Sequence, residues 1–141
     1  MTTSAEPATC TLQSTAISTR KAREFVSAEL TRLSGASSVI DDLGLVVSEL
    51  VANAIQHGDG SDITVSVDGR SPMWFAVTVT NGIAANNGSI ASRPPMDPVT
   101  WSVASTDQPS GRGLGIVRRL ADEIDVAEVS GSLRVSCRRR R

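Results

Sequence analysis

The stretch VIDDLGLVVSELVANAIQH, residues 39–57, is the most regular segment of the chain. Its apolar side chains recur at spacings of three and four, which is the period of a helix. They are so numerous that the helix must pack deeply against another layer, and we expect that layer to be a sheet. Ser38 and Asp41 resemble a capping box at its start, and Gly58 is typical of a helix end. The apolar positions are Val39, Leu43, Val46, Val47, Leu50, Val51, Ala54 and Ile55.

The segments on either side supply the other elements. Residues 8–15 are rich in β-forming residues, and residues 18–33 carry a second helical stripe that Ser18 or Thr19 can cap. Two alternating segments, around 63–68 and 75–80, flank a turn at 68–72 and predict an antiparallel hairpin. A third helix is expected from Leu114 to about Glu123, followed by strands at roughly 124–129 and 132–138.

This order of elements predicts an α+β fold. Helices and strand pairs do not alternate as they do in a doubly wound parallel sheet. We therefore expect a two-layer α/β sandwich, with a mixed, mainly antiparallel sheet and the helices on one face. The expected organisation is a disordered tail at 1–7, a single domain at 8–138 and a basic tail at 139–141. Residues 82–111 break the pattern, and a stretch of that length in a compact domain indicates either a functional loop or a wrong assignment of its elements.

Composition excludes several classes of function. The chain has 141 residues, a net charge of −1 and a pI of about 5.8, which argues against a domain-wide surface for nucleic acid. No apolar run approaches the length of a membrane span, and no secretory signal is visible, so the cytoplasm is the expected location. Two cysteines and one histidine cannot assemble a disulfide framework or a Cys/His zinc site. Lys21 is the single lysine, which excludes a P-loop.

One polar stripe interrupts the apolar helix at 39–57. Glu49, Asn53 and His57 follow one another at intervals of four and therefore share a face. An amphipathic helix could turn this stripe to water. Alternatively, a carboxylate beside an amide oxygen suits a hard cation such as Mg²⁺, which keeps several waters. Mg²⁺ held by one protein oxygen, with water and phosphate as the other ligands, would imply a nucleotide.

Two glycine-containing segments add to the stripe. Asn81-Gly82 ends a predicted strand, where glycine permits close backbone approach, although Asn-Gly is also a common hairpin turn. Gly111-Arg112-Gly113-Leu114-Gly115 stands at the start of the third helix, where backbone amides can converge on phosphate. A flexible loop ending has the same composition, and the spacing differs from the dinucleotide-binding fingerprint.

Taken in order, these features resemble the GHKL-type (histidine-kinase-like) ATPase domain. Within that superfamily, the chain resembles the small anti-sigma-factor serine/threonine kinases of Gram-positive bacteria. SELVANAIQHG, residues 48–58, is similar to their N-box, and GRGLGIV, residues 111–117, is similar to their second glycine box. The resemblance extends from about residue 12 to residue 138.

The resemblance implies a role for each site residue. Glu49 matches the general base and Asn53 the Mg²⁺ ligand, while residues 83–110 match the ATP lid. Asn81 stands where the family usually has an aspartate that accepts from the adenine amino group, and its neutral amide would bind more weakly. Arg112 substitutes for a lid arginine, since Gln108-Pro109-Ser110 occupy that place. The full set expected to bind ATP is Asn53, His57, Asn81, Gly82, Gly111, Arg112, Gly113, Leu114 and Gly115.

The function implied is an ATP- and Mg²⁺-dependent anti-sigma factor. It would sequester a sigma factor and phosphorylate a serine or threonine of an antagonist protein, and a homodimer is left open. The alternative is a non-catalytic interaction module of the same fold, with or without nucleotide. A histidine-kinase domain fits less well, because no helix pair with a phospho-accepting histidine precedes the domain. Nucleic-acid binding would rest on Arg138–Arg141 alone, and such runs are usually solvated ends.

Overall fold

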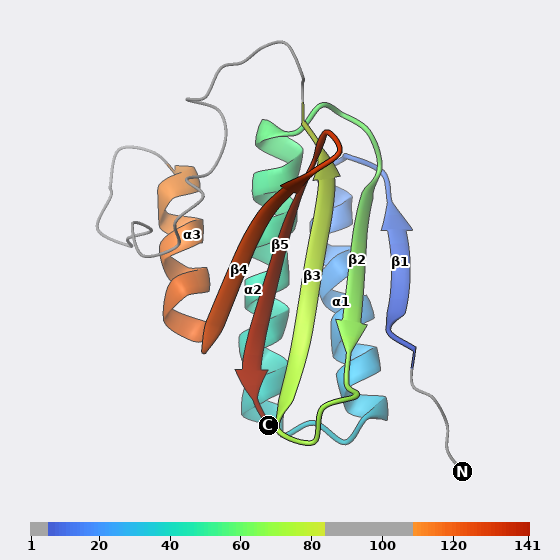
Figure 1. Cartoon of the computed structure of the whole chain (residues 1–141), viewed down its shortest axis with the longest axis vertical. Helices are drawn as coiled ribbons and strands as arrows, with labels where there is room; N and C mark the ends of the chain where they lie inside the picture. The colour runs from blue at the N-terminus through green and yellow to red at the C-terminus, as the bar shows by residue number, and fades with distance from the viewer. Residues whose placement is uncertain (1–5, 84–108) are drawn as a thin grey trace.

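The computed structural model describes residues 6–83 and 109–141. It contains three helices and five strands within those ranges (Figure 1). In chain order they are β1 (Ala8–Leu12), α1 (Ile17–Arg32), α2 (Ser37–His57), β2 (Ile63–Asp68), β3 (Trp74–Gly82), α3 (Pro109–Leu120), β4 (Glu123–Val129) and β5 (Ser132–Arg140). No helix in these ranges is long and apolar enough to cross a membrane.

The five strands form one open sheet in the order β1-β2-β3-β5-β4. All four neighbouring pairs are antiparallel. Helix α1 packs on β1 and β2, and α2 packs on β3 and β5, so both helices lie behind the sheet in Figure 1. Helix α3 packs beside α2. The expected two-layer α+β sandwich, with its helices on one face, is therefore confirmed, although its sheet is antiparallel at every described pair and not mixed.

The core lies between α2 and the inward face of the sheet. Strands β2 and β3 alternate strictly between buried and half-buried residues, as period-two patterning requires. Phe75 is the largest fully buried side chain, and it shares the core with residues from one whole side of α2. The most deeply buried α2 residues are Leu43, Val46, Val47 and Val51. Removing this apolar surface from water is the main force that holds α2 to the sheet.

The helix starts differ from the sequence expectation. Ala16 and Ala36 precede α1 and α2, and no side chain caps either helix. Ser18 is buried within α1, where its hydroxyl donates to the Gln13 carbonyl at 2.6 Å instead of capping the helix. The capping box at Ser38 and Asp41 is likewise wrong, because α2 already begins at Ser37.

The basic end of the chain is part of the sheet. Strand β5 continues to Arg140, two residues beyond the expected end at 138, and pairs with β3 over its whole length. Arg139 points to the helix side, where two of its N–H groups donate to Asp42 of α2 at 3.1 and 3.0 Å. Arg141 donates to the Ser71 and Gly69 carbonyls of the β2–β3 turn. These arginines join β5 to its neighbours, whereas a solvated end had been expected.

Candidate functional site

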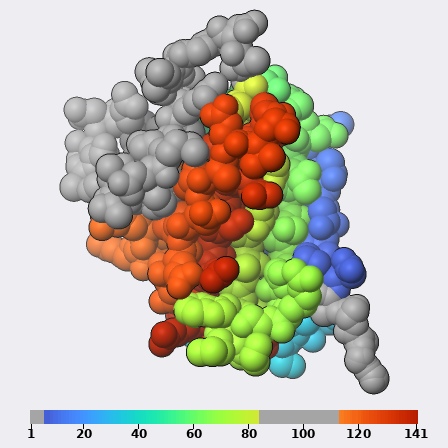
Figure 2. All heavy atoms as spheres, in the orientation of Figure 1, coloured from blue at the N-terminus to red at the C-terminus, as the bar shows by residue number. Residues whose placement is uncertain are grey.

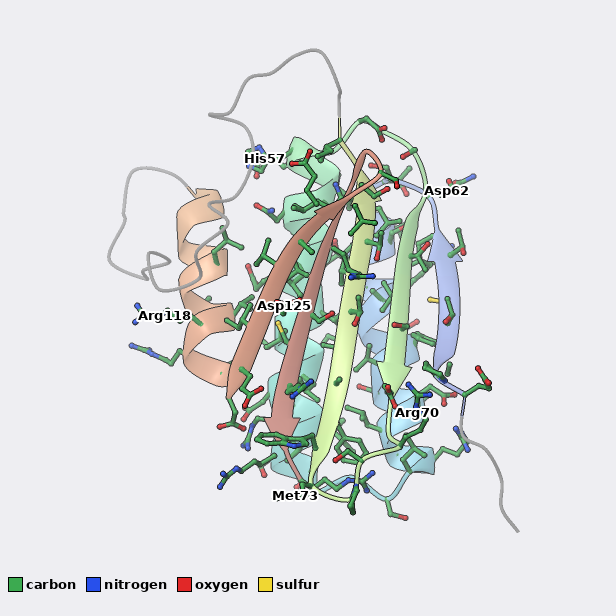
Figure 3. The ribbon with its side chains drawn as sticks, in the orientation of Figure 1. His57, Asp62, Arg70, Met73, Arg118 and Asp125 are labelled. Carbon is green, nitrogen blue, oxygen red and sulfur yellow. The ribbon has the colours of Figure 1, made fainter. Side chains whose placement is uncertain are left out.

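The polar stripe of α2 lies at the border of the core. Glu49, Asn53 and His57 are all half-buried, whereas Leu50, Val51 and Ala54 between them are buried. A stripe turned fully to water would be exposed, so that interpretation does not describe these residues. His57 marks the end of α2 at the upper end of the molecule in Figure 3. Burial lowers the pKa of His57 below its usual 6.5, which favours the neutral imidazole at pH 7.

Glu49 meets the glycine-rich segment of α3. A Cβ atom on Gly113 would lie 2.5 Å from Glu49 Oε1, closer than real Cβ atoms approach an oxygen. Gly113 is itself buried. The carboxylate of Glu49 therefore occupies the space that any other side chain at position 113 would need. The structure thus brings together two predicted site residues that are 64 positions apart.

The glycine-rich segment lies inside α3, although the sequence predicted it at the helix start. The helix begins at Pro109, five residues before the expected Leu114, so Gly111–Gly115 form its first turns. Leu114 is 6% exposed and belongs to the core, and Gly115 is buried. Their assignment to a phosphate site stays a prediction. Gln108 and most of the predicted lid at 83–110 lie outside the described residues, and so does the side chain of Arg112.

Asn81 and Gly82 close β3 at the same end of the molecule as His57. Both residues lie in the strand and pair with Leu133 and Ser132 of β5, so they do not form a plain hairpin turn. Asn81 is 7% exposed, and its Nδ2 donates to the Gly82 carbonyl at 3.1 Å. With that donor engaged, the amide Oδ1 is the atom suited to accept a hydrogen bond from a ligand.

The turn after α2 belongs to this end of the molecule, and the sequence analysis treated it only as a turn. The Asp59 N–H donates to the Gly82 carbonyl at 2.9 Å, which ties the end of α2 to the end of β3. A Cβ on Gly58 would lie 2.5 Å from the Ala54 carbonyl oxygen and 3.0 Å from Asn81 Nδ2. A Cβ on Gly82 would collide with the Asp59 carboxylate. The turn after α2 can therefore approach the end of β3 this closely only because positions 58 and 82 are both glycine.

Asp59 is held in place by its own turn. Its carboxylate accepts hydrogen bonds from the Ser61 hydroxyl and the Ser61 N–H, and these lower the pKa of Asp59 below its usual value. Asp59 is therefore an anion at neutral pH. The sequence Gly-Asp-Gly-Ser at 58–61 indicates the turn itself. It does not indicate the contact between Asp59 and Gly82, which depends on how β3 packs beside α2.

The described side chains fit a hard cation that takes most of its ligands from substrate phosphates and water. No group of three or more His, Cys, Asp or Glu side chains converges within residues 6–83 and 109–141. Asn53 offers one amide oxygen on the half-buried stripe, one helical turn after Glu49. One protein oxygen is typical of Mg²⁺ that keeps its waters and binds substrate phosphates.

Comparison with known families now identifies the fold. The model of the histidine kinase-like ATPase domain matches residues 12–137. The chain belongs to this family. The match includes Glu49, Asn53, Asn81 and the whole glycine-rich segment of α3. The expected relationship to histidine-kinase-like ATPases is therefore confirmed.

A solved structure has the same fold as this histidine kinase-like ATPase domain. It contains the RsbU and RsbW domains of Rv1364c from Mycobacterium tuberculosis, and it matches with a TM-score of 0.67 and 20% sequence identity. The match covers 96% of this chain and 32% of the other, so this chain spans about a third of that protein's length. At this level of identity the similarity shows the fold alone. A search of curated proteins finds no match.

Proposed function

We propose that this domain binds ATP with Mg²⁺ and acts as an anti-sigma factor that phosphorylates a serine or threonine of an antagonist protein. The observation that carries the proposal is the contact of Glu49 with Gly113. It sets a carboxylate from α2 against the glycine-rich segment of α3, within a fold whose family is named for ATPase activity. The resemblance of residues 48–58 to the N-box of anti-sigma-factor kinases supports the proposal. A match to a structure that includes an RsbW domain is consistent with it.

The residues present fit the proposed ligands. Gly113 has no side chain, so the Glu49 carboxylate can lie directly against the glycine-rich segment of α3. Asn53 would contribute an amide oxygen to Mg²⁺, and Asn81 Oδ1 would accept from the adenine amino group. Bound Mg²⁺ would neutralise charge on the phosphates, which is the main requirement of phosphoryl transfer.

Glu49 has the chemistry of a general base. In the proposed reaction its carboxylate accepts the proton of the serine or threonine hydroxyl. The hydroxyl oxygen then bonds to the γ-phosphorus of ATP, and the bond from that phosphorus to the β–γ bridging oxygen breaks, which releases ADP. The half-buried position of Glu49 limits its hydration without removing it from the reach of a substrate.

Replacing Glu49 with glutamine tests the proposal. The wild-type protein is incubated with labelled ATP, Mg²⁺ and candidate antagonist proteins, and phosphoserine and phosphothreonine are measured. Glu49→Gln should lower the rate of transfer by about 10²-fold or more, because it removes the base. It should change nucleotide affinity by less than about tenfold, or roughly 1.4 kcal/mol. Glu29→Gln, which alters a half-buried carboxylate of α1, is the matched control and should retain transfer.

A second candidate function is favoured by Asn81. A neutral amide at this position weakens the hydrogen bond to adenine, which suits an interaction module that depends little on nucleotide. If the wild-type protein transfers no phosphate yet binds a sigma factor or antagonist, the kinase proposal fails and the interaction module stands. Sigma-factor binding that survives Glu49→Gln agrees with both functions, so transfer by the wild-type protein decides between them.

A further inference from the structure

The end of α2 and the end of β3 are joined through one carbonyl group. The Gly82 carbonyl oxygen accepts from the Asp59 N–H at 2.9 Å and from Asn81 Nδ2 at 3.1 Å. In Figure 2 the yellow end of β3 lies beside the green turn after α2, at the top of the view. A carbonyl oxygen has two lone pairs, and these two donors use both of them. The turn after α2 therefore holds this carbonyl in one direction.

The Gly82 carbonyl determines which way round the Asn81 amide lies. A carbonyl oxygen can only accept a hydrogen bond, so the amide atom that faces it must be the donor, Nδ2. Turning the amide over would set Oδ1 against the carbonyl oxygen, which loses a hydrogen bond and brings two acceptors together. Asn81 is 7% exposed, so water cannot readily replace the lost bond. Among the described residues none donates to Oδ1, which leaves that oxygen for a ligand.

Gly58 lies against the same two groups. A Cβ atom on Gly58 would be 3.0 Å from Asn81 Nδ2, 3.2 Å from the Gly82 carbonyl oxygen and 2.5 Å from the Ala54 carbonyl oxygen. The last of these distances cannot be accommodated without movement of the turn. The φ angle of Gly58 is −80°, which any residue can adopt, so glycine is needed here for space. The missing side chain of Gly58 thus lets the turn close against the Asn81 amide.

We propose that Gly58 is a positioning residue that keeps the Asn81 amide in one orientation, so that the site selects nucleotides with an amino group at purine C6 over those with an oxo group there. The inference rests on the proposed function, because it takes Asn81 as the residue that contacts the base. The amino group of adenine donates to Oδ1, whereas the oxo group of hypoxanthine is an acceptor and would meet Oδ1 without a hydrogen bond. An amide free to turn over would serve both bases, since Nδ2 could donate to the oxo group.

A purely structural role for the same contact makes a different prediction. If Gly58 only held β3 to α2, its replacement would lower the fraction of folded protein. The apparent affinity for every nucleotide would then fall by the same factor. If Gly58 positions the amide, its replacement lowers the preference for adenine over hypoxanthine. The ratio of the two dissociation constants therefore separates positioning from stability.

The test compares the binding of ATP and ITP, whose bases are adenine and hypoxanthine. Isothermal titration calorimetry with Mg²⁺ present gives both Kd values. The wild-type protein should bind ATP about tenfold or more tightly than ITP, because a buried acceptor without a donor is costly. Gly58→Ala should bring the two Kd values to within about threefold of each other, because the amide can then turn over to suit either base.

Two further variants test the same contact. Gly82→Ala displaces the turn from the side of β3, because its Cβ would collide with the Asp59 carboxylate, and it should also lower the preference for ATP. This variant tests the positioning of the amide even if Gly58→Ala does not fold. Asn81→Ala removes the amide itself and should bring the Kd values for ATP and ITP to within about threefold of each other.

Gly44→Ala is the matched control for Gly58→Ala. A Cβ on Gly44 of α2 would have its nearest neighbour at 3.5 Å, so the wild-type ratio should be kept. Equal binding of ATP and ITP by the wild type overturns the inference and leaves the kinase proposal standing. If the wild type binds neither nucleotide, the proposed function fails and the inference fails with it. Folded Gly58→Ala and Gly82→Ala proteins, verified by circular dichroism, that keep the wild-type ratio would show that the turn does not position the amide.

Discussion

At the scale of single residues, Gly113 is the position where side-chain size matters most for the site. Its missing Cβ leaves room for the Glu49 carboxylate, which is the end of a flexible side chain. We expect Gly113→Ala to displace that carboxylate without unfolding the protein, because alanine also favours the helix by about 1 kcal/mol over glycine. Transfer should fall by about 10²-fold or more, as in Glu49→Gln, while the Tm changes little. Kinetics and thermal melts of the same preparation check both parts.

Gly44 supplies the matched control for Gly113. It is a buried glycine of α2, and a Cβ there would have its nearest neighbour at 3.5 Å, an ordinary contact. Gly44→Ala should therefore keep full transfer and melt at the same or a higher temperature. If Gly113→Ala transferred phosphate as fast as Gly44→Ala, the position of the Glu49 carboxylate would not matter for the reaction.

At the scale of secondary-structure elements, Arg139 connects β5 to α2. Its guanidinium donates twice to one Asp42 oxygen, and both side chains are only about a quarter exposed, at 24% and 29%. We expect this pair to couple by about 1 kcal/mol, near the upper end for surface ion pairs. A double-mutant cycle with Arg139→Ala and Asp42→Ala, followed by urea unfolding, measures the coupling.

The pair Arg20–Glu24 on α1 provides the comparison for that cycle. Its two side chains are 77% and 68% exposed and meet at 3.5 Å, so solvent and salt screen their attraction. The coupling in this second cycle should be close to zero. If the two cycles gave equal coupling energies, the Arg139–Asp42 pair would stabilise the protein no more than an ordinary surface ion pair does.

The sequence predicted the presence of the helices and strands more accurately than it predicted their first and last residues. Periodicity identified α2 and the hairpin of β2 and β3, because their apolar residues dominate one face. It missed the helix starts because Ala16 and Ala36 offer no capping side chain. It ended β5 early because consecutive arginines resemble a solvated tail, whereas Arg139 has a partner 97 residues away in Asp42.

Only part of the candidate site could be predicted in the same way. The stripe of Glu49, Asn53 and His57 follows from helical spacing within one element. The contacts of Gly113 with Glu49 and of Gly82 with Asp59 each join two elements that are distant in sequence. Spacing along one element carries no information about such pairs. The missed contribution of Gly58 and Asp59 has the same cause.

At the scale of the whole molecule, ligand binding should appear as added stability. A ligand that binds only the folded state raises the free energy of unfolding, by about 2.7 kcal/mol at 100 times its Kd. We expect ATP with Mg²⁺ to raise the Tm more than ATP with a chelator. Asn53→Ala should abolish the Mg²⁺-dependent part of the increase, because the amide oxygen is the proposed metal ligand. Differential scanning fluorimetry with no ligand, with ATP and Mg²⁺, and with ATP and a chelator measures these changes in Tm.

Gln56→Ala is the control for Asn53→Ala, since Gln56 is an exposed amide on the same helix. It should respond to Mg²⁺ as the wild type does. If Asn53→Ala still showed a Mg²⁺-dependent increase in Tm, Asn53 would not be a metal ligand. That result would not bear on the role of Glu49, which the phosphoryl-transfer assay tests separately.

The strand order has a consequence for how the protein is made. Strand β5 follows every other described element in the sequence, yet it lies between β3 and β4. During translation, β3 therefore waits with one edge unpaired, and β4 waits with no neighbour, until residues 132–140 leave the ribosome. The sheet can close only after synthesis has passed this point. Nascent chains that stop before β5 would expose the unpaired backbone N–H and C=O groups along one edge of β3, which makes them prone to aggregation.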